Sequence, residues 1–155
     1  MRFDDFHAGQ IIVAGPMVLS EDDIIRFASE HDPQGFHMDR EAAAKGKFGC
    51  VIASGWHTCA VAMRLVAQVA LQGSDASASP GIAYIKWPRP VLPGDALLLR
   101  AEVLEVGRSQ RTPTTGKLRW CWRLFNQRDE LVLELEAMTL FDLPAPNAHA
   151  ASVGA

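Results

Sequence analysis

The sequence predicts an α+β domain in which an antiparallel β-sheet wraps around one long buried central helix. Two observations carry this prediction. Residues 57–71 are apolar on nearly every side, and the segments that follow them alternate between apolar and polar residues. A helix that is apolar all round is buried, and consecutive strands with short connections pair antiparallel.

The first part of the chain is expected to be helical. Ser20 and Asp23 have the spacing of a capping box and precede a helix predicted over residues 21–30. This helix should end before Pro33, because the residue that precedes a proline disfavours helical dihedral angles. Asp39 is the expected N-cap of a second, short helix in the alanine-rich run that follows.

The second half of the chain is expected to form strands, because apolar residues recur there at every second position. The predicted strands cover residues 82–87, 96–106, 117–125 and 130–141, and residues 11–19 offer a fifth. Within 117–125 one apolar face is formed by Leu118, Trp120, Trp122 and Leu124. The Gly-, Ser- and Ala-rich segment 72–81 is interpreted as a flexible loop.

Composition indicates an ordinary globular protein. The chain has 155 residues, of which 48% are hydrophobic and 21% charged, with a formal net charge of −3. One domain over residues 1–143 and a disordered tail over 144–155 are expected. Scattered basic residues argue against nucleic acid or an anionic membrane as the partner. The chain shows no signal-peptide pattern and no membrane-spanning apolar run, so a cytoplasmic location is expected.

Metal binding is not expected. The three cysteines lie far apart without a CxxC pair, which favours reduced thiols over disulfides or a zinc site. His31, His37 and Asp39 are close in sequence, but they match neither a zinc motif nor an EF-hand loop.

The segment HDPQGFHMD, residues 31–39, concentrates the candidate catalytic residues. Asp32 and His37 stand five positions apart, and a carboxylate and an imidazole that converge can hold and activate one water molecule. Taken singly, Asp32 is also explained as a turn residue and His37 as an ordinary core or solvent imidazole. The N-cap role explains Asp39 fully.

This segment and its continuation resemble the MaoC-like dehydratases, which are hotdog-fold enoyl-CoA hydratases of (R) specificity. The family motif reads approximately G-D-x-N-P-x-H-x-D, followed by an alanine-rich turn, a Phe and an apolar residue before a Gly. The counterpart here is HDPQGFHMDREAAAKGKFGCVIASG, and RPVLPGD at 89–95 resembles a turn that those proteins carry between strands. The resemblance spans roughly residues 3–142, and the matching positions are Asp32, His37, Asp39 and Gly55.

The resemblance implies a hotdog fold and a hydro-lyase that interconverts 2-enoyl and 3-hydroxyacyl thioesters of coenzyme A, with Asp32 and His37 as acid and base. Gly55 opens the central helix, whose first N–H groups lack partners and can stabilise an oxyanion. The chain departs from the family at Gln34, where Asn is usual, and at Gly35, where Pro is usual. The serine that some members carry in the central helix is replaced by the apolar run 61–63. Gly35 predicts more backbone freedom between the two catalytic candidates.

Several further residues are candidates for the site. Ser54 is grouped with Gly55 as a candidate oxyanion or substrate-binding residue and is expected to form a hydrogen bond near the helix start. Pocket lining is assigned to Phe36, Trp56 and His57. Charge-assisted bonds to coenzyme A phosphates are assigned to Lys86, Arg89, Arg108 and Arg111, although a solvated surface explains each equally well. Core or subunit-interface positions are the simplest interpretation of Trp56, Trp87, Trp120 and Trp122.

Two other functions stay open. A hotdog thioesterase would use a carboxylate to drive water to C1 of the thioester. A subunit that binds acyl-CoA without turnover would be compatible with the departures at Gln34 and Gly35. In each case an acyl-CoA is the expected small-molecule partner and no separate cofactor is expected. Four or five strands are too few to enclose an apolar helix. We therefore expect a homodimer, or an oligomer of dimers, in which the sheets of two subunits join edge to edge.

Overall fold

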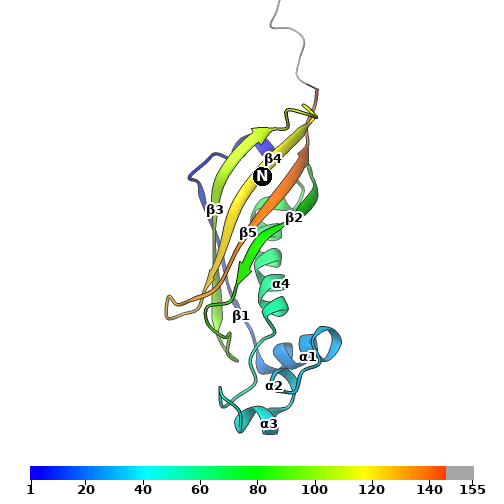
Figure 1. Cartoon of the computed structure of the whole chain (residues 1–155). Coiled ribbons are helices and arrows are strands. Elements are labelled where there is room, and N and C mark those ends of the chain that lie inside the picture. Colours follow the sequence, from blue (N-terminus) through cyan, green and yellow to red (C-terminus); the bar gives the residue numbers. More distant parts are fainter. Residues whose placement is uncertain (146–155) are drawn as a thin grey trace, which may run out of the picture.

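The computed structural model describes residues 1–145, which form one antiparallel sheet curved around the central helix (Figure 1). The sheet has the strand order β1-β3-β4-β5-β2. Its strands are β1 (Ile11–Val18), β2 (Ala76–Lys86), β3 (Ala96–Arg108), β4 (Thr115–Phe125) and β5 (Leu131–Asp142). The predicted α+β architecture is confirmed, including the strand near the N-terminus. The predicted disordered tail falls, from residue 146 onward, outside the described residues.

Both predicted helix caps are present. Helix α1 (Glu21–His31) begins after Ser20, whose Oγ accepts a hydrogen bond from the Asp23 N–H at 3.1 Å. The single turn α2 (Gly35–Met38) leads to α3 (Arg40–Ala44), and Asp39 Oδ1 accepts the N–H groups of the second and third residues of α3. A short 3-10 helix, η1 (Phe3–Asp5), precedes β1.

The central helix α4 (Gly55–Val66) begins at Gly55, the residue expected to open it, and Ser54 caps it by accepting the Trp56 N–H at 3.2 Å. The chain then continues as a π-helical segment, η2 (Ala67–Leu71). The prediction that this helix is buried on every side is wrong for the single chain. The sheet covers one face, and Met63 and Val69 on the other face are exposed.

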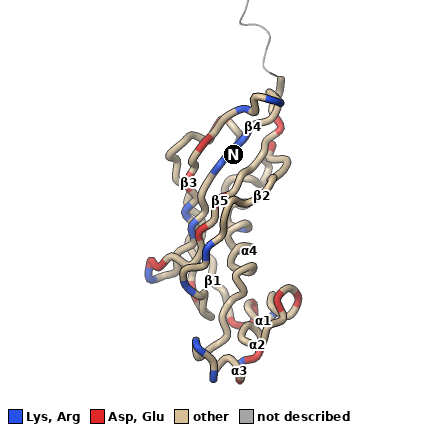
Figure 2. Tube along the Cα trace, in the orientation of Figure 1, with Lys and Arg blue, Asp and Glu red and all other residues tan. Residues whose placement is uncertain are grey.

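The core lies between α4 and the concave face of the sheet. The predicted apolar face of β4 is buried against α4, and Leu118, Trp120 and Leu124 are fully inaccessible to solvent. The convex face is charged instead. Arg123 bridges Glu102 and Glu134 there at 2.9 and 2.7 Å. Figure 2 shows acidic and basic residues interspersed along β3, β4 and β5.

The segment 72–81 is not the loop that its composition predicts, because β2 already begins at Ala76. This strand pairs with β5, and Ser79 Oγ donates a hydrogen bond to the Met138 carbonyl at 2.7 Å. The register of the pair shifts around Pro80 and Gly81. Proline and glycine are tolerated there because β2 is an edge strand of the sheet.

The helices α1, α2 and α3 lie together beyond one end of the sheet, next to the first turn of α4 (Figure 1). The helix–strand arrangement therefore leaves the start of α4 accessible between these short helices and the turn that follows β2. Across residues 1–145, no helix combines the length and apolar character needed to cross a bilayer.

Candidate active site

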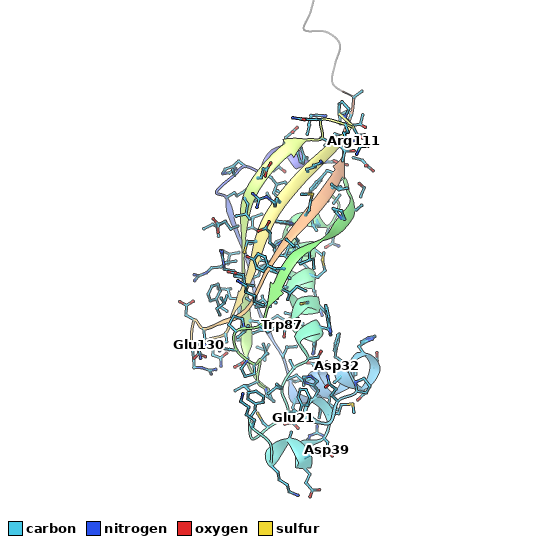
Figure 3. All side chains as sticks on the ribbon, in the orientation of Figure 1. Glu21, Asp32, Asp39, Trp87, Arg111 and Glu130 are labelled. Carbon is cyan, nitrogen blue, oxygen red and sulfur yellow. The ribbon has the colours of Figure 1, made fainter. Side chains whose placement is uncertain are left out.

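A cavity of about 430 Å³ lies at the start of α4. Four separate segments contribute to its walls, and the residues on which its chemistry depends are Asp32, His37, Lys47, Gly55, Trp87 and Arg89. Figure 3 shows Asp32 and Trp87 at this end of the molecule, on either side of the first turn of α4. The cavity thus contains both of the candidate acid–base residues.

The structure brings Asp32 and His37 together. His37 Nε2 lies 3.4 Å from Asp32 Oδ2, and the imidazole is buried. The second ring nitrogen, Nδ1, lies 2.6 Å from the carbonyl oxygen of Ile52. A carbonyl oxygen can only accept a hydrogen bond, so Nδ1 carries a proton. In the neutral ring, Nε2 therefore presents its lone pair on the side of Asp32.

Both oxygens of Asp32 accept hydrogen bonds. Ser54 Oγ donates to Oδ2 at 2.6 Å, and Gln34 Nε2 donates to Oδ1 at 2.7 Å. The hydrogen bond from Ser54, then that from Gln34, and the nearby charge of His37 lower the pKa of Asp32 below its ordinary value. Asp32 is accordingly a carboxylate at neutral pH and a weak base. Gln34 thus has a defined structural partner in the site.

Gly55 occupies a crowded position at the first turn of α4. Trp87 Nε1 donates to the Gly55 carbonyl at 3.0 Å, and a Cβ atom added to Gly55 would lie 2.7 Å from the indole ring. The Gly55 N–H makes no hydrogen bond with any residue in the described part of the chain. It is a free donor at the positive end of a helix, where negative charge is stabilised.

Only one of the four predicted phosphate ligands reaches this cavity. Arg89 lines it, but Lys86 lies at the end of β2 with its ammonium 5.0 Å from the centre of the Tyr84 ring. Arg108 and Arg111 line a separate cavity of about 380 Å³. Figure 3 shows Arg111 at the opposite end of the molecule from Asp32. Within one chain Arg108 and Arg111 therefore lie away from the Asp32–His37 pair (Figure 3).

Two of the three predicted lining residues do not line the cavity. His57 faces α1 instead and stacks on Phe27, with ring centroids 4.4 Å apart. Burial lowers the pKa of His57, and its Nδ1 has no partner among residues 1–145. Phe36 packs on the ring of His37 at 4.1 Å between centroids and is otherwise exposed. Trp56 does line the cavity.

The tryptophans divide into two pairs. Trp120 and Trp122 are buried in the core, as predicted, whereas Trp56 and Trp87 are 59% and 43% exposed. The exposed pair lies at the cavity with ring centroids 5.8 Å apart. Trp87 lies just before the turn 89–95, and the hydrogen bond from the Ala53 N–H to the Val91 carbonyl holds that turn beside the start of α4.

The residues weighed as metal ligands have other partners. Asp39 caps α3, and the ring of His31 packs on Phe27 at 4.9 Å between centroids. No three His, Cys, Asp or Glu side chains within the described residues gather into a group that could hold a metal ion. The three cysteines are free thiols, and Cys121 is buried.

The antiparallel sheet wrapped around a central helix is the hotdog fold, and the Asp32–His37 pair lies beside the start of that helix. The family model of the MaoC-like domain matches residues 7–119, and the chain belongs to that family. This result confirms the resemblance on which the sequence interpretation depended.

Individual proteins and solved structures are also similar to this chain. The uncharacterized protein YdeM of Bacillus subtilis is 35% identical over 140 residues, which are 90% of this chain and 98% of that protein. The 3-hydroxyacyl-thioester dehydratase Z of Mycobacterium tuberculosis is 31% identical over 106 residues, 64% of this chain and 70% of that protein. The crystal structure of a MaoC-like dehydratase from Rhodospirillum rubrum superposes with a TM-score of 0.81 at 32% identity, covering 92% and 97% of the two chains.

The hydrogen bond from Ser54 to Asp32 should make stability depend on pH. A carboxylate whose pKa is lowered by folding adds stability above its unfolded pKa of about 3.9, and this contribution is lost as pH falls through the folded value. We expect Ser54→Ala to lower the free energy of unfolding at pH 7 and the deficit to shrink below roughly pH 4. Urea titrations at both pH values measure this difference.

Thr139→Val provides the matched control. It also removes a buried hydroxyl, but the partner there is Trp120 Nε1 at 3.2 Å and not a carboxylate. Its effect should be the same at both pH values. A deficit for Ser54→Ala that does not change with pH would contradict the role assigned to this hydrogen bond.

Proposed function

We propose that this protein hydrates a 2-enoyl thioester to the 3-hydroxyacyl thioester and catalyses the reverse dehydration. The observation that carries the proposal is the pairing of an ionised Asp32 with His37, whose Nε2 faces Asp32 at 3.4 Å beside a free helix N-terminus. The sequence relationship to a 3-hydroxyacyl-thioester dehydratase supports this choice of reaction.

The two residues divide the proton transfers. A water molecule bound between Asp32 Oδ2 and His37 Nε2 loses a proton to Nε2 while its oxygen bonds to C3 of the substrate. The electron pair of the C2–C3 double bond moves onto C2 and the thioester oxygen, and the imidazolium then returns its proton to C2. Asp32 is the weaker base because it accepts two hydrogen bonds, so it stays ionised and stabilises the imidazolium.

The thioester oxygen needs a donor while the negative charge is on it. In this proposal the Gly55 N–H supplies the donor, and the positive end of α4 adds its dipole. The thioester is carried by coenzyme A as the substrate. The reaction needs no additional cofactor to balance it, because the addition of water transfers no electrons to or from the protein.

Crotonyl-CoA tests the proposal directly. We expect the enoyl-thioester absorbance to fall on addition of the protein without release of free thiol. Release of thiol would instead indicate a thioesterase, and tight binding without either change would indicate a non-catalytic acyl-CoA-binding subunit. Either of these outcomes would overturn the proposed reaction, and a panel of enoyl-CoA thioesters then defines the preferred acyl chain.

We also propose that the protein functions as a homodimer. A second apolar cavity of about 430 Å³ runs between α4 and the edge strand β2, and it is lined by Met63, Ile82 and Leu135 among others. Within the described residues β2 has a partner strand on one side only. A second copy that pairs its own β2 with this edge would continue the sheet and cover the exposed face of α4.

Ile82→Glu should convert the dimer into a monomer, because it buries a charge at the centre of the proposed interface. Sedimentation velocity at micromolar concentration measures the change. Ile11→Glu is the matched control, since Ile11 is also exposed but lies on β1 at the opposite edge of the sheet. A parent protein that is monomeric at this concentration, or equal effects of the two substitutions, would contradict the assignment.

A further inference from the structure

His57 is a buried side chain that the proposed reaction does not use. It lies in the first turn of α4, is 8% exposed, and does not line the cavity that contains Asp32 and His37. Its ring stacks on that of Phe27 in α1, with ring centroids 4.4 Å apart and ring planes inclined by 5°. This stack joins the C-terminal half of α1 to the first turn of α4, which lie next to each other in Figure 1.

The His57 ring acts as a flat apolar surface and not as a charge. Burial lowers its pKa below the ordinary value, and Asp23 and Arg26 of α1 act on that pKa in opposite directions. These two charged groups also pair with each other at 2.7 Å. Nδ1 of His57 has no hydrogen-bond partner among residues 1–145. The ring is therefore neutral at neutral pH, and stacking is the interaction through which it contacts α1.

The carboxylate of the acid–base pair is attached to the end of α1. Asp32 is the C-cap of this helix, and its backbone N–H donates to the Ala28 carbonyl at 2.8 Å. His37 belongs to a different helical turn, α2, and its Nδ1 is held by the Ile52 carbonyl. A movement of the end of α1 therefore displaces the Asp32 carboxylate relative to the imidazole.

Two contacts hold this end of α1 against the start of α4. Ser54 Oγ donates to Asp32 Oδ2 at 2.6 Å. Phe27, five residues before Asp32, stacks on His57, three residues after Ser54. Ile24 anchors the first half of α1 in the core, so these two contacts act on the half that ends at Asp32. The stack opposes a roll of α1 about its own axis, which would swing the carboxylate away from His37.

We propose that His57, through its stack on Phe27, is a positioning residue that holds the Asp32 carboxylate in place beside His37. The kinetic consequence of this inference rests on the proposed function. Neither ring of the stack lines the cavity, so loss of the stack should lower kcat and leave KM nearly unchanged. Phenylalanine has a flat apolar ring and should replace the neutral imidazole, whereas leucine fills the space without stacking.

Steady-state kinetics with crotonyl-CoA, well below the melting temperature, test this role. His57→Leu should lower kcat by roughly 10- to 100-fold, the effect of displacing a catalytic group by about 1 Å, and His57→Phe should keep kcat close to that of the parent. Phe27→Leu breaks the same stack from α1. The double variant Phe27→Leu/His57→Leu should therefore lower kcat no more than either single substitution. If a His57 variant does not fold, Phe27→Leu and Phe27→Tyr make the same comparison.

Phe6→Leu is the matched control. Phe6 is also buried against an aromatic ring, that of Trp120 at 5.9 Å between centroids, but it does not line the cavity. This substitution should lower the melting temperature and leave kcat unchanged. A kcat of His57→Leu equal to that of the parent, an equal loss in His57→Phe or Phe6→Leu, or additive effects of the two leucine substitutions in the stack would each overturn the positioning role.

The pKa of Asp32 provides a measurement that does not require turnover. Carbon-13 NMR titration of its carboxyl group, assigned with Asp32→Asn, follows this pKa in each variant. The hydrogen bond from Ser54 holds it below its ordinary value in the parent. Loss of the stack in His57→Leu or Phe27→Leu should raise it toward about 3.9, whereas His57→Phe and Phe6→Leu should not change it. If the parent hydrates no thioester, the proposed reaction fails on its own, and this titration decides the positioning role. An Asp32 pKa that is the same in the parent and in both leucine variants of the stack overturns it.

Discussion

Replacing Asp32 by asparagine or His37 by alanine should lower the rate of crotonyl-CoA hydration by at least about 100-fold each, the usual contribution of a general acid–base group. The amide introduced by Asp32→Asn would still accept the Ser54 hydrogen bond but would carry no charge to stabilise an imidazolium. The His37→Ala variant would lack the group that takes the proton from water. Steady-state rates of absorbance loss measure both effects.

The fold should survive these substitutions, because neither side chain contributes to the apolar core. Circular dichroism and thermal unfolding provide the check. Asp39→Asn is the matched control within the same segment, since asparagine also caps helices and Asp39 contacts only the first turn of α3. Turnover near that of the parent in either Asp32→Asn or His37→Ala would remove the proposed mechanism.

Gly55→Val should abolish most of the turnover and also destabilise the protein. The added Cβ would lie 2.7 Å from the indole of Trp87, so the ring or the helix must move. Overpacking of this kind costs about 1–3 kcal/mol. From the sequence alone, Gly55 was either an oxyanion donor or a packing glycine. The structure gives it a packing role, so the single variant does not separate the two.

A variant that lacks the Trp87 ring separates the oxyanion role of Gly55 from its packing role. Trp87→Ala removes the ring that a Cβ atom on Gly55 would meet. In that background, Gly55→Val should change the melting temperature little, but its branched side chain would occupy the place of the thioester oxygen beside the N–H and lower turnover by a further factor of about 100 to 1,000, the effect of losing access to an oxyanion donor. Equal turnover of Trp87→Ala and the double variant would show that the Gly55 N–H does not stabilise the reaction.

Much of the fold was predictable because its signals are local. The period of the strands, the apolar run of α4 and the caps at Ser20 and Asp39 are all features of adjacent residues. Residues 76–81 could not be predicted in this way. Their composition is that of a loop, and they form a strand because β5 lies beside them to accept their hydrogen bonds.

The candidate site was predictable to the extent that it is continuous in sequence. Asp32 and His37 share one motif, and Ser54 and Gly55 mark the start of a recognisable helix. Lys47 and Trp87 were missed because only the packing of two turns against α4 brings them to the cavity. Arg108 and Arg111 were chosen by charge, and charge alone does not determine where a side chain lies in the fold.

The two departures from the family motif have different structural outcomes. Gln34 donates a hydrogen bond to Asp32, so the longer amide side chain supports the carboxylate. Gly35 begins the helical turn α2, where no positive φ is required. The backbone freedom predicted for it is opposed by the bond between His37 and the Ile52 carbonyl, which holds the imidazole from a separate segment.

In the proposed dimer, the exposed groove along α4 and β2 makes the stability of the fold depend on protein concentration. When two folded chains bury this surface in each other, unfolding converts one dimer into two free chains. Each tenfold dilution then favours the unfolded chains by about 1.4 kcal/mol per mole of dimer, from the change in free energy for one factor of ten. The melting temperature should therefore rise with protein concentration.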